Sequence, residues 1–391
     1  MNAEREIVRI ERSILVWART SLGLTIQEVA TKLDKDKKTI LQWEYGKSLP
    51  TLAQLEKLAY GVYKRPLAVF FLSKPPLETT PRQDFRTLPE KAITNLSPEL
   101  RLFFRRAKHH QLVLKQINDG KNPLPKLIHK EFRLRTSSHP ENTAKKVRDY
   151  LGITKQLQQG FKSSEEAFKH YRDIVEQTGV YLFQYPLQEV RGFSLMDKEF
   201  PVIVINSSDR PNGKIFTLFH ELCHILFNTG GVFGDTYSQE FKKNPNQIEV
   251  FCNQFASDVL LPGSELIAEE RVLENVNNKE WTEEALQEIA EKYKVSKEVV
   301  LRKLLDLGKT SQSYYNRLRS KWNEKYEKDK TANKKKQSGG NYHATNLSHL
   351  GKNYVTQILA TFHSGKLTPL QVADFLNIRV NRIKDYEKLV F

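Results

Sequence analysis

Hydrophobic residues recur at helical spacing along most of the chain. The stretch 216–226 (FTLFHELCHIL) is apolar on nearly every side, which predicts a buried helix. The stretch 249–262 (EVFCNQFASDVLLP) predicts a second, largely buried helix. Directly before the first helix the period changes, and short β-branched or aromatic runs separated by turns predict strands (VYLFQYP, RGFSLM and FPVIVINSS). We therefore expect a mainly α fold with a small antiparallel β-sheet.

The N-terminal residues predict a bundle of short helices. Thr25 and Glu28 have the spacing of a capping box, which opens a helix over Ile26–Leu33. After a short turn, a further helix runs from about residue 36 to residue 45, with Ile40 and Trp43 on its buried side. We expect this part to be a five-helix domain.

Two kinds of stretch interrupt the helical pattern. One is Pro-rich (PPLETTPRQDFRTLPE) and indicates an extended connector, and the other is charge-rich with almost no aliphatic residues (SKWNEKYEKDKTANKKKQSGGNYHAT). The domains expected from this pattern are an N-terminal helical domain at 1–74, a helical connector at 75–164, a domain with the sheet and both buried helices at 165–310, a charged flexible linker at 311–346 and a C-terminal helical segment at 347–391.

Other helical segments carry less information about function. Thr282 and Ser296 cap two helices with helix-turn-helix rhythm. Apolar residues of the second helix are expected in the core: Leu301, Leu304 and Leu305. His109 and His110 have no His or acid placed to join them, so we expect them to be solvated and not to bind a metal.

Composition places the chain among cytoplasmic proteins with a polyanionic partner. The net charge is +16 and the pI is about 9.5, which favours nucleic acid, although Lys residues that only solvate the surface would give the same balance. There are two Cys, no apolar run long enough to cross a bilayer and a charged N-terminus (MNAEREIVRIER). We expect a cytoplasmic, nucleoid-associated protein without a membrane partner.

The buried helix at 216–226 carries the chemistry. His220 and His224 are one helical turn apart and project from the same face, and Glu221 follows the first of them. This is the H-E-x-x-H pattern of zinc hydrolases, in which both His bind the metal and the Glu is general base on a metal-bound water. Glu249 begins the second helix and is the candidate third ligand, with Asn253 four residues later as a partner for the outer nitrogen of a ligating His. The alternative is a chance match on a surface helix, against which the apolar flanks argue.

Both motifs resemble a known family. FTLFHELCH followed by E-x-x-C-N-x-F-A-x-x-x-L-L-P is similar to the ImmA/IrrE family of bacterial metallopeptidases, over roughly residues 165–310. The resemblance implies one zinc ion per chain, bound by His220, His224 and Glu249, with Glu221 as catalytic base. The family usually has small residues where this chain has Cys223 and Cys252. These two thiols are expected to face each other where the helices meet, either as compact packing or as a redox pair.

The N-terminal domain resembles a second family. Residues 10–72, and above all W-E-x-G-x-x-x-P, are similar to the helix-turn-helix of the XRE/Cro repressors. The resemblance implies that the helix at about 36–45 enters the major groove of double-stranded DNA. Residues on its outward face can reach base edges or phosphates, and two that follow it suit backbone contacts: Lys37, Lys38, Thr39 and Gln42, then Lys47 and Ser48. A module that binds protein instead remains the alternative, and domains of this type often act as homodimers.

Together these features indicate a DNA-binding transcriptional regulator fused to a zinc endopeptidase. An edge strand beside the zinc would pair with an extended peptide, so a protein is the expected substrate, in particular a repressor, a toxin–antitoxin partner or this chain itself. Tyr237 is a candidate for stabilising the oxyanion. The rival function is an antitoxin-like or phage-type repressor in which the zinc domain is a scaffold for a partner protein.

Overall fold

The structure is a computed structural model that describes residues 10–77, 96–135, 137–227, 245–275, 278–333 and 342–391. The chain divides into two compact units, residues 1–109 and 110–391. Helix α7 (Pro98–Ile117) crosses the boundary in sequence. None of the described helices combines the length and the apolar composition needed to cross a bilayer.

The N-terminal unit forms the short helices that the sequence predicts. They are α1 (Arg12–Ser21), α2 (Ile26–Leu33), α3 (Lys37–Glu44), α4 (Leu52–Glu56), the π-helical turn η1 (Lys57–Val62) that continues it, and the 3-10 turn η2 (Leu67–Phe71). The capping box at the start of α2 is present, because the Glu28 amide donates to the Thr25 hydroxyl (3.2 Å) and the Thr25 amide donates to the Glu28 carboxylate (2.7 Å). Ile40 and Trp43 lie in the core, as predicted.

The second unit contains a three-stranded sheet. Its strands are β1 (Tyr181–Tyr185), β2 (Gly192–Leu195) and β3 (Val202–Asn206), in the order β1-β3-β2. The mainly α class with a small sheet is confirmed, but the expected antiparallel arrangement is wrong for one pair. β2 is antiparallel to β3, whereas β1 is parallel to it, with Tyr181 opposite Val202. β3 lies between β1 and β2, so β1 and β2 do not pair with each other. β1 and β3 are neighbours that run in the same direction.

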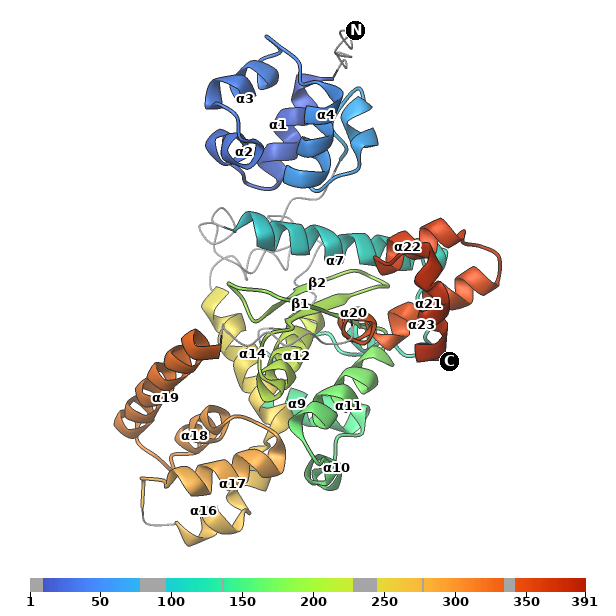
Figure 1. Cartoon of the computed structure of the whole chain (residues 1–391). Coiled ribbons are helices and arrows are strands. Elements are labelled where there is room, and N and C mark those ends of the chain that lie inside the picture. Colours follow the sequence, from blue (N-terminus) through green and yellow to red (C-terminus); the bar gives the residue numbers. More distant parts are fainter. Residues whose placement is uncertain (1–9, 78–95, 136, 228–244, 276–277, 334–341) are drawn as a thin grey trace. The chain divides into compact units, whose positions relative to one another are not determined.

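Helices cover both faces of this sheet (Figure 1). The other helices of the unit are α8 (Ile128–Glu131), α9 (Pro140–Leu151), α10 (Lys155–Gly160), α11 (Ser164–Glu176), α12 (Pro211–Leu226), α14 (Pro245–Leu260), α15 (Gly263–Ile267), α16 (Glu270–Glu274), α17 (Glu283–Tyr293), α18 (Lys297–Asp306), α19 (Gln312–Asn333), α20 (Tyr342–Leu350), α21 (Lys352–His363), α22 (Pro369–Leu376), η3 (Val380–Arg382) and α23 (Ile383–Val390). α12 packs against β2 and β3 and against α14. On the opposite face, Gln111 of α7 donates to the Phe200 carbonyl (2.8 Å).

Burial on α12 and α14 explains why the two helices pack together. α14 buries residues at i, i+3, i+4, i+7, i+8 and i+11, which form one continuous apolar stripe: Ile248, Phe251, Cys252, Phe255, Ala256 and Val259. α12 begins with Pro211, whose fixed φ suits the first helical position, and is apolar over most of its circumference. A helix buried on this scale holds its few polar side chains in defined positions.

Three sequence-based expectations need correction. The connector predicted at 75–164 ends too late, because Ala144, Val147 and Leu151 of α9 lie in the core against α14. The linker predicted at 311–346 begins with helix α19, whose first two turns bury Tyr314, Tyr315 and Leu318 at helical spacing. Residues 334–341 of that linker lie outside the described part of the chain.

The third correction concerns His110, which is buried and not solvated. Its Nδ1 lies 2.9 Å from the Tyr354 hydroxyl, and its ring stacks on Phe183 with the centroids 4.6 Å apart. His109 is exposed, as expected. Of the residues expected in the core, Leu301 and Leu304 are fully buried and Leu305 packs against them in part.

Candidate metal centre and DNA-facing helix

The two His of α12 and the Glu of α14 converge. The Nε2 atoms of His220 and His224 are 3.2 Å apart, and the Glu249 carboxylate oxygens lie 3.4 Å from His220 Nε2 and 3.3 Å from His224 Nε2. In the part of the chain that the structure describes, these three residues form the one group of His, Cys, Asp or Glu side chains able to hold a metal ion. Glu249, the expected third ligand, therefore lies beside both His residues.

These separations fit a zinc ion. A tetrahedral ion with donor distances of about 2.0–2.1 Å holds its ligand atoms about 3.3–3.4 Å apart, which is the spacing found here. The donor set of two imidazoles and one carboxylate leaves a fourth position open, as catalytic zinc sites do. The residues present therefore match the group that the sequence implies.

Electrostatics favour an ionised carboxylate in this cluster. Burial disfavours the charge of Glu249, but hydrogen bonds from His220 and His224 outweigh burial and hold the pKa of the Glu249 carboxyl well below its usual range. The Glu249 carboxylate is thus negatively charged at neutral pH and suited to bind a metal ion.

Glu221 lies next to the cluster, against strand β2. Its side chain is buried, with 8 % of its surface exposed. Gly192, the first residue of β2, is so close to α12 that an added Cβ would lie 2.6 Å from Thr217 Cγ2, 2.7 Å from the Val204 carbonyl oxygen and 3.5 Å from Glu221 Cγ. The sequence analysis did not single out Gly192. A glycine in a short strand that precedes the metal helix is the signal that could have found it.

Asn253 does not join the cluster, which corrects its expected role. Its side chain is exposed on α14, and Nδ1 of His220 has no hydrogen-bond partner among the described residues. Tyr237, the candidate for oxyanion stabilisation, lies outside the described residues.

The two cysteines meet between the ligand helices, as expected. Cys223 and Cys252 are both fully buried, and their thiols are within hydrogen-bonding reach of each other. Burial raises the pKa of both thiols, so both are protonated at neutral pH. A protonated, buried thiol reacts slowly with oxidants, which favours packing over a redox role.

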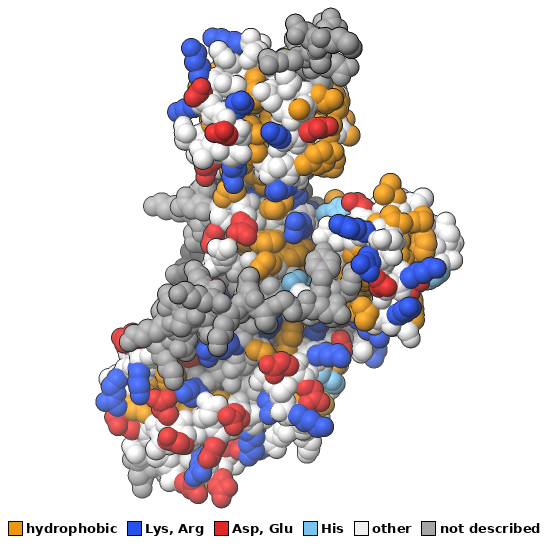
Figure 2. Space-filling model, viewed as in Figure 1, with side chains coloured by type: hydrophobic (Ala, Val, Ile, Leu, Met, Phe, Trp, Pro, Cys, Tyr) orange, Lys and Arg blue, Asp and Glu red, His pale blue; other side chains and the backbone are white. Residues whose placement is uncertain are grey.

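The N-terminal unit presents a basic helix to solvent. On α3 and after it, Lys37, Lys38 and Lys47 are exposed, and Thr39, Gln42 and Ser48 are partly exposed. Figure 2 shows Lys and Arg side chains distributed over the visible face of this unit. Arg19 of α1 holds the end of α3 by donating two hydrogen bonds to the Glu44 carboxylate (2.7 and 2.8 Å).

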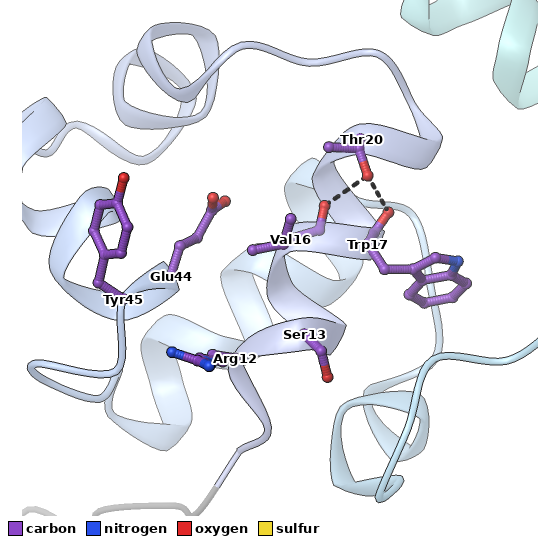
Figure 3. Close-up of a pocket in the computed structure, with 7 residues that line it drawn as sticks. All are labelled: Arg12, Ser13, Val16, Trp17, Thr20, Glu44 and Tyr45. Carbon is purple, nitrogen blue, oxygen red and sulfur yellow. Dashed lines mark hydrogen bonds between the residues drawn. The ribbon is translucent and has the colours of Figure 1, made fainter.

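A hollow of about 460 Å³ also lies on this unit, between α1 and the end of α3 (Figure 3). Its lining residues are Arg12, Ser13, Val16, Trp17, Thr20, Glu44 and Tyr45. Its one acid, Glu44, is engaged by Arg19. The hollow therefore offers no unpaired carboxylate to a metal ion.

Comparison with known proteins agrees with this division of the chain. Residues 175–305 match the model of a peptidase family described as IrrE N-terminal-like domain, and residues 15–59 match the family described as Helix-turn-helix. No curated protein matches the chain significantly. The chain thus joins a helix-turn-helix DNA-binding domain to a metallopeptidase-type domain related to IrrE and ImmA.

Proposed function

We propose that this chain is a zinc-dependent endopeptidase that acts in the cytoplasm, at DNA, on a regulatory protein. The proposed substrate is a repressor, a toxin–antitoxin partner or another copy of this chain. The observation that carries the proposal is the convergence of His220, His224 and Glu249, with the buried Glu221 next to His220 in the chain. A site that only stabilised the fold would not need a free carboxylate next to an open ligand position.

The proposed chemistry assigns each residue one task. His220, His224 and Glu249 would hold zinc, which when bound acts as a Lewis acid that polarises a peptide carbonyl and makes water more acidic. Glu221 accepts the proton of the attacking water and delivers it to the leaving amine. The burial of Glu221 between α12 and β2 keeps bulk water from competing for that proton.

The substrate class follows from strand β2. β2 pairs with β3 on one side, and among the described residues no strand pairs with its other side. An extended peptide that pairs with this edge would run past Glu221, because Gly192 brings the strand against α12. Backbone pairing of this kind selects extended polypeptide over folded protein or small molecules.

DNA binding would bring the peptidase to its substrate. Lys37, Lys38, Thr39 and Gln42 face outward on α3, in the positions proposed for contacts with bases and phosphates, and Lys47 and Ser48 follow at the turn. A repressor bound nearby would then meet the peptidase at a raised effective concentration.

The proposal is tested by mapping new protein N-termini in cells of the source organism. Cells that produce the wild-type protein should contain cleavage products that are missing from cells with Glu221→Gln. Glu284→Gln, which removes one exposed carboxylate of α17, is the matched control and should cleave like the wild type. Identical sets of N-termini in wild type and Glu221→Gln would instead favour the regulator whose zinc domain is a scaffold.

A further inference from the structure

The C-terminal helices repeat the helix-turn-helix of the N-terminal unit. Residues 24–44 align with residues 367–387 without a gap, at a constant offset. The positions with the same residue in both segments are Leu24 and Leu367, Thr25 and Thr368, Val29 and Val372, Ala30 and Ala373, Leu33 and Leu376, Ile40 and Ile383, and Glu44 and Glu387. All but Thr25 and Glu44 are apolar, so the repeat preserves the pattern that packs the motif.

The backbones follow the same path. α22 has 8 residues, as α2 does, and Thr368 caps it with a capping box like that of Thr25. The residue that ends the first helix is left-handed in both segments, with φ of 53° at Asp34 and 52° at Asn377. The second helical segment then begins at equivalent residues, Lys37 in α3 and Val380 in η3.

The packing is equivalent as well. Ile383 and Tyr386 are buried residues of α23, and they correspond to Ile40 and Trp43, which are buried residues of α3. In both segments an acid of the second helix is bound by a basic residue of the helix that precedes the motif. Glu44 is bound by Arg19 of α1, and Glu387 lies 3.0 Å from His363 of α21.

Not every helix pair with this turn is available to a ligand. α17 and α18 are joined through a left-handed Lys294, with φ of 56°. The second helix of that pair is nevertheless covered, because Leu301 and Leu304 are fully buried and Lys303 forms an ion pair with Asp258 of α14. This pair is therefore part of the core of its unit. A helix that binds DNA differs from a structural helix of the same motif in being exposed to solvent.

The second helix of the C-terminal pair is exposed and basic on its outward side. Arg379, Asn381, Arg382, Lys384 and Lys388 are all exposed. Asp385, the acid among them, lies 3.1 Å from Arg382, and both side chains are open to solvent. An exposed pair of this kind is weak, so an acceptor group of the DNA can replace the carboxylate. Figure 2 shows Lys and Arg side chains over these helices.

We propose that α22, η3 and α23 form a second DNA-binding helix-turn-helix that places Asn381 and Arg382 in the major groove of double-stranded DNA. Arg382 corresponds to Thr39 and Asn381 to Lys38 in the N-terminal motif. Arg is suited to guanine and Asn to adenine, while Lys384 and Lys388 can contact phosphates. The ligand is duplex DNA, because the exposed charges are mainly positive and the same backbone path is a helix-turn-helix in the N-terminal unit.

The test is the salt dependence of binding by the full-length protein to a long mixed-sequence DNA duplex. Lys384→Ala combined with Lys388→Ala removes the two exposed charges that are assigned to phosphate contacts. The slope of log affinity against log salt should fall by about two units, since each lost phosphate contact contributes about 0.9. The control is Lys169→Ala combined with Lys352→Ala, which removes two exposed charges of α11 and α21 and should leave the slope unchanged.

Repeating both double variants in a Lys37→Ala, Lys38→Ala background separates the two DNA sites. A reduced slope from Lys384→Ala, Lys388→Ala in that background supports the second site, even if the N-terminal changes have no effect and that assignment fails. A slope equal to that of the control overturns the inference. So does a change in oligomeric mass by light scattering without a change in slope, because Leu370, Leu389 and Phe391 would then form a protein interface.

Discussion

Lys37 and Lys38 are the residues whose exposure most directly supports DNA binding by the N-terminal unit. Both lie at the start of α3, unlike Ile40 and Trp43, which face the core. Changing each Lys to Ala should flatten the salt dependence of DNA affinity by about one unit. Gln42→Ala should instead relax sequence preference and cost about 1–3 kcal/mol at the cognate site. An unchanged slope in the Lys37→Ala, Lys38→Ala protein would remove the recognition role of α3.

The two cysteines lead to a prediction of no effect. Cys223 and Cys252 are fully buried and protonated, so mild peroxide should not join them into a disulfide during a short exposure. Zinc retention and peptidase activity after peroxide should therefore be equal in the wild type and in Cys223→Gly, Cys252→Ala. A loss that occurs in the wild type alone would identify a redox switch instead.

The residues of the metal cluster could be predicted from the sequence, whereas the positions of some other polar side chains could not. His220 and His224 could be paired because helical spacing fixes which side chains share a face, and Glu249 was named as the acid at the start of the second buried helix and through the family resemblance. Asn253 and His110 could not be placed, because their positions depend on how helices distant in sequence are packed. His110 is buried by Phe183 and Tyr354, which lie far along the chain, and no local pattern around residue 110 encodes those contacts.

At the scale of elements, strand β2 depends on Gly192. An added Cβ would lie 2.7 Å from the Val204 carbonyl oxygen, and that backbone atom cannot rotate away. Gly192→Ala should therefore push β2 from α12, lower the free energy of unfolding by about 1–3 kcal/mol and reduce peptidase activity more than zinc content. Gly160→Ala is the control, since an added Cβ there has nothing within 4 Å. Full activity of Gly192→Ala would argue against a role of β2 in substrate binding.

A second element-scale prediction concerns Glu269, which joins three helices. It accepts hydrogen bonds from Lys292 (2.5 Å) and Tyr293 (2.6 Å) of α17 and lies 2.8 Å from Lys155 of α10. Burial opposes its charge, but these partners outweigh burial and lower the pKa of the Glu269 carboxyl from 4.5 to about 2. The ionised form is therefore stabilised by folding, so this contribution is complete above pH 4.5 and is lost as the pH falls towards 2.

Glu269→Gln should accordingly lower the free energy of unfolding at pH 7 by about 1–3 kcal/mol, and chemical denaturation at a series of pH values should show this difference shrinking below pH 4.5. Glu288→Gln removes an exposed partner of Arg271 and should leave the stability nearly unchanged. A deficit that stays constant down to pH 2 would show that Glu269 acts by packing and not by its charge.

Element boundaries were predictable where local signals mark them. The helix at Ile26–Leu33 was placed to the residue by its capping box. The start of α19 was missed because Tyr314, Tyr315 and Leu318 stand directly before the charge-rich stretch and are buried only when α19 packs against α18. The direction of β1 relative to β3 was missed for a related reason, since sequence spacing does not show on which side of β3 the strand β2 pairs.

At the scale of the whole molecule, the chain joins a peptidase-type domain to a helix-turn-helix domain and, by our inference, to a second one. Two DNA-binding motifs in one chain would let a monomer bind two DNA half-sites. The homodimer expected from the N-terminal motif would then not be required for binding to paired half-sites.

The central claim is that α12 and α14 together build a catalytic zinc site, and the most direct measurement is the metal content of purified full-length protein. The wild type should contain about one zinc per chain. His220→Ala and Glu249→Ala should lose most of it, whereas Glu221→Gln should keep it and lose proteolysis. A Glu221→Gln protein as depleted of zinc as the ligand variants, or a Glu249→Ala protein that keeps its zinc, would contradict the account.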